Sequence, residues 1–257
     1  MSDKIIPLDP YAALRAATPA RIGLGRSGDS LPTRALLDFQ LAHARARDAV
    51  HGAFDAETLA RELAPLPTIC VQSQVEDSAT YLRRPDLGRR LNADSRQRLT
   101  NLAETPDVVF VIADGLSASA VQTQAAALIA ASLPGLTGLK IGPAVVARFG
   151  RVALGDEIAA LLGGKLCVLL VGERPGLSVA DSLGVYLTYE PRPGRRDSER
   201  NCISNIHANG GLSLEQAAAT LCWLARAALA RQETGVSLKD ESPRLPLTAP
   251  PQPELAP

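Results

Sequence analysis

Long apolar runs closed by Gly, Pro or Asp occur through the middle of the chain and predict buried strands. Segments 143–154 and 165–176 each contain such a run, and the unit 107–132 reads as an apolar strand, a turn and a long Ala-rich helix. Strands that are apolar throughout are covered by helices on both faces, so these runs predict a parallel-rich sheet. Segment 68–75 is β-rich and predicts another strand, whereas 183–191 alternates and predicts an edge or half-exposed strand.

Apolar residues at helical spacing predict helices on either side of these strands. The expected helices cover 10–20, 34–52, 57–64, 94–103, 156–162 and 212–233. Thr33 is expected to cap the second helix because a Ser or Thr hydroxyl can accept a hydrogen bond from the first turn. The segments 81–91 and 200–211 lack a clear period and are expected to be loops.

The order of these elements predicts the fold class α/β. We expect a Rossmann-like parallel-rich sheet with helices on both faces, preceded by an N-terminal helical lobe. The division is 1–66 for the lobe, 67–239 for the α/β domain and 240–257 for a tail. The tail is rich in Pro and is expected to be disordered.

Composition excludes several classes of protein. The chain has 27 Lys and Arg against 27 Asp and Glu, so no net charge favours nucleic acid or an anionic membrane. The longest apolar run is too short to cross a bilayer. The four cysteines are scattered and no zinc-type spacing is present, which predicts free thiols. With no apolar leader at the N-terminus, we expect a cytoplasmic protein without a membrane partner.

Three polar segments follow predicted strands, where open α/β sheets bind their ligands. They cover residues 114–117, 149–152 and 172–176. Asp114 or Ser117 either caps the following helix or contacts a ligand, and the residues alone leave both open. Glu173 follows a buried strand, so it either forms an ion pair or faces a cleft.

The segment 200–211 combines a thiol, an imidazole and three asparagines. Cys202 and His207 could suggest a thiol nucleophile with its base, but a separation of five residues within a loop is no recognised spacing. Asn205 and Asn209 are better suited to hydrogen-bonding amide groups of a ligand.

Two segments are rich in arginine and can recognise either phosphate or an acidic protein surface. Because the chain has no net basic excess, we expect them to contact a partner subunit. The Gly-rich stretch between the first arginines lacks the preceding strand of a dinucleotide fingerprint. The arginines are Arg21, Arg26, Arg34, Arg83, Arg84, Arg89 and Arg90.

Several blocks in this order resemble the small subunit of ethanolamine ammonia-lyase. They are ARIGLGRSGDSLPTRALLDFQLAHARARDAV, YLRRPDLGRRL, VFVIADGLSASAV, ARFGRVALGDEIAALLG, LLVGERPGLSVADSLGVYLTY and ERNCISNIHANGG. The resemblance covers about residues 10–239, and GERPGL followed by CISNIH is its most specific part.

The resemblance implies an adenosylcobalamin-dependent lyase that converts ethanolamine to acetaldehyde and ammonia. It further implies a hetero-oligomer in which the cofactor lies between this chain and a large catalytic subunit. The cofactor contacts that it implies here are Val152, Glu173 and Cys202, and it implies no catalytic residue in this chain.

The motif D-x-H-x-x-G, whose histidine replaces the cofactor's own base on cobalt, is missing from the sequence. His43, His51 and His207 all lack the aspartate two positions earlier. We therefore expect adenosylcobalamin to bind base-on, with its benzimidazole on cobalt. Some relatives in the family carry a longer N-terminal extension, associated with a bacterial microcompartment, whereas only about ten residues precede the helical lobe here. We therefore expect a cytoplasmic protein and leave encapsulation open.

Two other readings compete with this one. The first is a free-standing nucleotide-binding or hydrolytic α/β enzyme that uses Asp114, Ser117 and Glu173. The second is a purely structural partner whose arginine segments dock a larger subunit without contacting a ligand.

Overall fold

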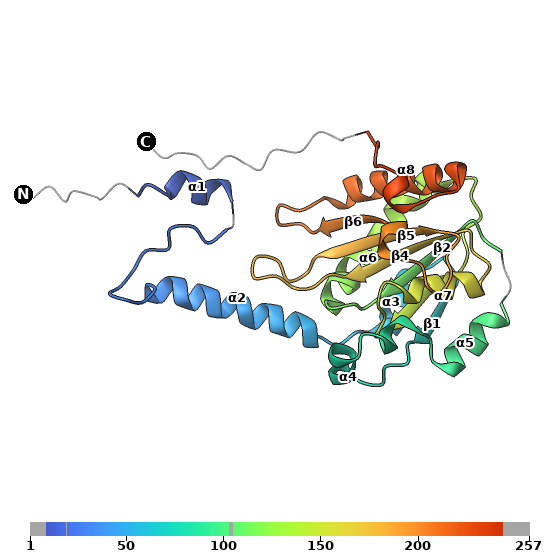
Figure 1. Ribbon diagram of the computed structural model, residues 1–257, viewed down its shortest axis with the longest axis horizontal. Helices are drawn as coiled ribbons and strands as arrows, with labels where there is room; N and C mark the ends of the chain where they lie inside the picture. Colours follow the sequence, from blue (N-terminus) through green and yellow to red (C-terminus); the bar gives the residue numbers. More distant parts are fainter. Residues whose placement is uncertain (1–8, 19, 103–104, 244–257) are drawn as a thin grey trace, which may run out of the picture.

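The computed structural model describes residues 9–18, 20–102 and 105–243, and these contain one six-stranded sheet (Figure 1). The strand order is β1-β3-β2-β4-β5-β6. The first four strands of that order run parallel, whereas β5 pairs antiparallel with β4 and with β6. The chain is therefore α/β with a mixed sheet, and its parallel part is the one that the apolar runs predicted. The strands are β1 (Thr68–Gln72), β2 (Val108–Ala113), β3 (Ala144–Arg148), β4 (Leu166–Gly172), β5 (Leu183–Tyr189) and β6 (Asn201–Ile206).

The apolar strands are buried because they supply side chains to two cores at once. In β2, Val108, Phe110 and Ile112 face one core, and the residues between them face the other. Strand β4 alternates in the same way. Each strand therefore needs an apolar residue at every position. Burial of each large apolar side chain stabilises the folded state by roughly 1.5–3 kcal/mol.

Helices cover both faces of the sheet. One core is closed by α3 (Ala56–Glu62), α6 (Ala118–Ser132) and α8 (Leu214–Arg231). The other is closed by α5 (Ala93–Thr100) and α7 (Leu154–Leu161). The apolar positions of these helices face the cores, as their amphipathic spacing predicted, whereas α7 also buries Asp156 and Glu157.

The N-terminal segment differs from this body. Helices α1 (Ala12–Ala17) and α2 (Thr33–His51) contain no buried residue, and α2 extends away from the sheet (Figure 1). Helix α3 instead packs on the sheet, with Leu59 and Leu63 in the core. The division at residue 66 stays a prediction, and residues 244–257 of the expected tail lie outside the described residues.

Four local predictions are wrong. Segment 183–189 is an inner strand, because β6 pairs with its outer side. Part of the expected loop 200–211 is that strand β6. The expected loop 81–91 begins within α4 (Ser78–Arg83) and includes a 3-10 turn at Leu87–Arg89. Thr33 is the first residue of α2, whose capping position is taken by Pro32.

Among the described helices, none combines the length and hydropathy that a membrane span requires.

Candidate functional site

Asp114 joins the ends of β2 and β3 at the edge where the parallel strands finish. Its Oδ2 accepts a hydrogen bond from the N–H of Phe149 at 2.8 Å, and its Oδ1 accepts from Gly150 and Gly115, each at 3.0 Å. Burial raises the pKa of Asp114 to about 6, although the three N–H donors oppose this. The carboxylate is thus fully used within the chain and holds the strand ends in place.

Ser117 takes the capping role that the sequence left open. It is the N-cap of α6, and its Oγ accepts from the N–H of Ala120 at 3.4 Å and donates to the carbonyl of Ala180 at 2.9 Å. Both Asp114 and Ser117 are therefore engaged inside the fold. This removes two of the three residues on which a free-standing enzyme would depend.

Glu173 follows directly on β4, and its carboxylate is held by neutral donors. Oε2 accepts from the Ser182 hydroxyl at 2.5 Å and from the N–H of Asn205 at 3.2 Å. Asn205 has a φ of 62°, which an asparagine tolerates, and this conformation allows its N–H to reach Glu173. Within the described part of the chain Glu173 forms no ion pair, so the ion-pair reading is wrong.

Val152 and Glu173 line the same depression, which we call the strand-end pocket. Its volume is about 400 Å³. The polypeptide segments that follow β2, β3 and β4 meet here because the carboxyl ends of parallel strands share one edge of the sheet. The remaining lining residues are Tyr81, Gly115, Leu116, Gly150, Arg151, Val171, Gly172, Arg174 and Tyr186.

Cys202 lies beside this pocket and not in its lining. It is an exposed residue of β6 and pairs in register with Tyr186 of β5, whose side chain lines the pocket. The surrounding chain displaces enough water to raise the pKa of the Cys202 thiol, which disfavours the thiolate. Burial likewise raises the pKa of Tyr186 to about 12, with a further contribution from Cys202. Neither group is prepared to act as a nucleophile or base near neutral pH.

His207 is buried and does not serve Cys202. Its Nε2 lies 2.9 Å from Oδ1 of Asn205, and its Nδ1 accepts from the N–H of Asn209 at 3.2 Å. The two asparagines thus fix the imidazole and the turn after β6. The thiol–imidazole pair that the sequence could suggest is absent from this arrangement.

The arginine segments are spread over different parts of the molecule. Arg21 lies near the start of the N-terminal lobe, stacks on Phe39 of α2 and donates to the carbonyl of Leu177 at 3.3 Å. Arg84 pairs with Asp86, whereas Arg89 points into a second depression beside the strand-end pocket. The seven arginines therefore do not form one surface.

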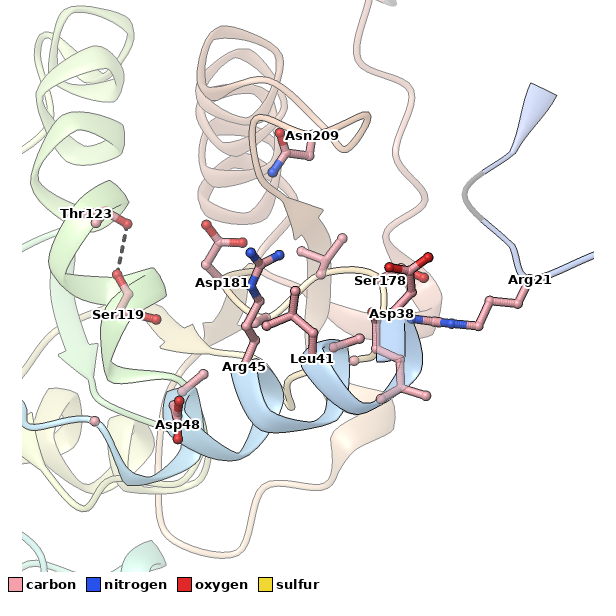
Figure 2. A pocket seen from close by; sticks show the side chains of 17 residues that line it. Arg21, Asp38, Leu41, Arg45, Asp48, Ser119, Thr123, Ser178, Asp181 and Asn209 are labelled. Atoms are coloured by element: carbon pink, nitrogen blue, oxygen red, sulfur yellow. Dashed lines mark hydrogen bonds between the residues drawn. The ribbon is translucent and has the colours of Figure 1, made fainter. Parts of the chain in front are cut away.

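A further depression lies between α2 and the body of the molecule (Figure 2). Its volume is about 750 Å³, and its lining includes Asp38, Arg45 and Asp48 of α2 and Ser119, Thr123 and Asp181 of the body. Figure 2 shows these side chains. None of Val152, Glu173 and Cys202 belongs to its lining. This α2 groove is separate from the strand-end pocket.

Two residues of the strand-end pocket lie in segments that the sequence pointed to, but neither was given a role of its own. Tyr81 and Arg151 form a stacked pair, with the guanidinium carbon 4.1 Å from the ring centroid. The Tyr81 hydroxyl donates to the carbonyl of Gly150 at 3.0 Å. Arg151 directly follows Phe149 and Gly150 at the end of β3, so its place after a strand was the available signal.

The described residues contain no cluster of His, Cys, Asp or Glu side chains that could hold a metal ion.

Comparison with known proteins confirms the family resemblance that the sequence blocks indicated. Residues 8–239 match the family model described as "Ethanolamine ammonia-lyase light chain (EutC)". A protein of Bradyrhizobium diazoefficiens, named ethanolamine ammonia-lyase small subunit, is 54% identical over 248 residues, which cover 94% of this chain and 95% of that protein. A protein of the same name from Rhodopseudomonas palustris is 57% identical, over 89% of this chain and 89% of that protein. Another from Pseudomonas syringae pv. tomato is 50% identical, over 94% of this chain and 87% of that protein. The chain therefore belongs to the ethanolamine ammonia-lyase small-subunit family.

Proposed function

We propose that this chain forms one wall of an adenosylcobalamin site at its interface with a large catalytic subunit. The complex would convert ethanolamine to acetaldehyde and ammonia. The observation that carries the proposal is that Val152 and Glu173, on segments after two different strands, line one pocket, with Cys202 on the strand next to it.

The chemistry of the strand-end pocket suits one side of a corrin ring. Val152, Leu116 and Val171 offer apolar contact to a flat ring. The rim of a corrin carries amide groups, for which Glu173 is an acceptor. Its Oε2 is fixed by Ser182 and Asn205, so the carboxylate has a defined orientation toward a ligand.

The pocket is too small and too open to enclose such a cofactor alone. A volume of about 400 Å³ is typical of a site for a much smaller molecule. A partner must therefore cover the opposite side and exclude water. This fits a small subunit that works in a hetero-oligomer.

Substrate chemistry would belong to the large subunit. When bound, the cofactor supplies an adenosyl radical by cleavage of its cobalt–carbon bond. Glu173 is the only carboxylate among the described lining residues of the strand-end pocket, and it is held by internal hydrogen bonds. The role of this chain would be to bind and orient the cofactor.

The described lining of the pocket also contains no histidine. This supports base-on binding, in which cobalt keeps its own benzimidazole. We place the complex in the cytoplasm, with enclosure in a bacterial microcompartment as a further proposal.

The proposal is tested with the complex of this chain and a co-expressed large subunit. Equilibrium dialysis with adenosylcobalamin should show a dissociation constant raised about tenfold by Glu173→Ala, since a charge-assisted hydrogen bond is lost. Glu62→Ala, at an exposed position of α3, is the control and should change nothing. Unchanged affinity of the Glu173→Ala complex, or full activity of the large subunit alone, would overturn the proposal.

A further inference from the structure

A second depression adjoins the strand-end pocket, and its lining is dominated by arginine. We call it the arginine pocket; its volume is about 470 Å³. It shares Arg151, Val152 and Tyr186 with the strand-end pocket, so the two form a continuous concave surface. Its other lining residues are Pro85, Arg89, Ala153, Arg195, Arg196, Asp197 and Arg200.

Two of the five arginines are already neutralised by carboxylates. The Arg195 guanidinium lies 2.5 Å from Glu199, and that of Arg200 lies 2.7 Å from Asp156. Arg200 also contacts Asp197, the only acidic residue in the described lining, at 3.3 Å. These pairs fix the wall and leave little charge to offer a ligand.

The other three, Arg89, Arg151 and Arg196, form no ion pair with any carboxylate in the described residues. Arg89 and Arg196 are exposed and come from separate segments, after α4 and after β5. Three uncompensated guanidinium groups around one hollow produce a positive potential that attracts an anion.

Arg151 is held in place before any ligand arrives. Its Nη2 donates to the carbonyl of Tyr81 at 2.9 Å, and its guanidinium lies on the Tyr81 ring. Gly88 makes this possible, because a Cβ there would come within 2.8 Å of the Arg151 side chain. A fixed guanidinium loses little entropy when it binds an anion.

We propose that the arginine pocket binds a phosphodiester, and that this group is the nucleotide tail of the corrinoid whose ring lies in the strand-end pocket. This inference rests on the proposed function. Guanidinium groups match the geometry of phosphate oxygens, and several of them converge here on one small concave site. Val152 lines both pockets, so the apolar surface for the ring lies directly beside the basic surface for the tail.

An acidic surface of the partner subunit is the competing occupant, and the arginine-rich sequence by itself favoured it. The concave shape and the lining shared with the strand-end pocket favour the phosphate instead, since sites for small molecules and cofactors are concave. If the occupant is the phosphate, loss of the arginines weakens cofactor binding. If it is the partner surface, loss of the arginines weakens assembly of the complex.

The test uses the complex with the co-expressed large subunit and three probes. Adenosylcobalamin carries the full tail, adenosylcobinamide phosphate keeps the phosphate alone, and adenosylcobinamide has neither phosphate nor base. Binding is measured by equilibrium dialysis and followed by the visible absorption of the corrinoid. The variant is Arg89→Ala with Arg196→Ala, and its matched control is Arg90→Ala with Arg192→Ala, exposed arginines of the same two segments outside the pocket.

We expect the variant to raise the dissociation constants of adenosylcobalamin and adenosylcobinamide phosphate by about tenfold, and to leave that of adenosylcobinamide unchanged. Inorganic phosphate should compete with both phosphate-bearing probes only at high concentration, which distinguishes a corrinoid tail from a free-phosphate site. Equal weakening of all three probes, weakening of cobalamin alone, no weakening, or loss of assembly would each overturn the inference. If the unaltered complex binds none of the probes, it is the proposed function that fails.

Discussion

Arg200 and Asp156 form an ion pair that is sealed from solvent. Nη1 of Arg200 lies 2.7 Å from both carboxylate oxygens, and the two side chains are 2% and 1% exposed. Arg200 immediately precedes β6, and Asp156 lies in the first turn of α7. The pair thus ties the strand that carries Cys202 to the helix that follows Val152.

Removal of one partner should strongly destabilise the fold. Asp156→Asn leaves the buried guanidinium of Arg200 without its compensating charge, which costs about 3–5 kcal/mol of unfolding free energy. Asp197→Asn removes another contact of the same guanidinium, but Asp197 is 95% exposed, so it should cost less than about 1 kcal/mol. Urea unfolding of both variants measures the difference, and equal losses would contradict it.

Asp114 should give the stability of the protein a specific dependence on pH. Its pKa is raised from 3.8 to about 6 in the fold. Between these pH values the Asp114 carboxyl is ionised in the unfolded chain but still protonated in the folded chain. The contribution of Asp114 to the unfolding free energy is therefore fully present below about pH 4 and is lost as pH rises through 6. The unfolding free energy of the wild type minus that of Asp114→Asn should fall by on the order of 3 kcal/mol across this window.

Asp77→Asn provides a control of opposite sign. Hydrogen bonds from Thr80, through its backbone N–H and its hydroxyl, lower the pKa of Asp77. The stability that Asp77 contributes is therefore present above its unfolded pKa and is lost as pH falls. When unfolding free energies are measured at several acidic pH values, the difference between wild type and Asp114→Asn should fall as pH rises, whereas the difference between wild type and Asp77→Asn should increase. A flat difference for Asp114→Asn would show that burial does not control its ionisation.

A side chain at Gly115 should destabilise the fold strongly, because this residue lies where the ends of β2 and β4 meet. It has a φ of 61°, and a Cβ would fall 2.3 Å from the carbonyl oxygen of Gly172. Gly28 has nearly the same φ of 62° but nothing within 4 Å of that position. Gly28→Ala should therefore cost only the backbone strain, about 1–2 kcal/mol, and Gly115→Ala should cost roughly 1–3 kcal/mol more. Thermal unfolding checks this, and equal losses would mean that the strand ends move apart without cost.

The proposed base-on binding predicts the magnetic spectrum of the reduced cofactor. In the complex, cob(II)alamin should show nitrogen coupling from its own benzimidazole, because the described residues that line the strand-end pocket include no histidine. Incorporation of ¹⁵N-histidine into this chain should leave the electron paramagnetic resonance spectrum unchanged. A change in the coupling pattern on labelling would show that one of the three histidines is a cobalt ligand.

The sequence by itself determined the inner part of the fold. Strands β2 and β4 must bury both faces, and this need for an apolar residue at every position is visible in the chain without any partner. The same pattern placed polar residues such as Glu173 directly after a strand, and hence at the edge where ligands bind. These are local properties of the chain.

Strand β6 was decided by tertiary structure. Its buried residues, Ile203 and Ile206, are three positions apart and so hide the usual period of two. A register shift against β5 accommodates this spacing, and the hydrogen bonds that make the segment a strand come from β5. No local pattern could supply them.

The pockets were decided in the same way. The stacking of Arg151 on Tyr81 joins residues 70 positions apart, and the Asp156–Arg200 pair joins residues 44 positions apart. Which arginines are neutralised and which remain free depends on these pairings across the fold. The sequence therefore determined that polar residues follow the inner strands at one edge of the sheet. Only the folded arrangement decided which side chains face the pockets there, because burial and charge compensation depend on neighbours that are distant in the chain.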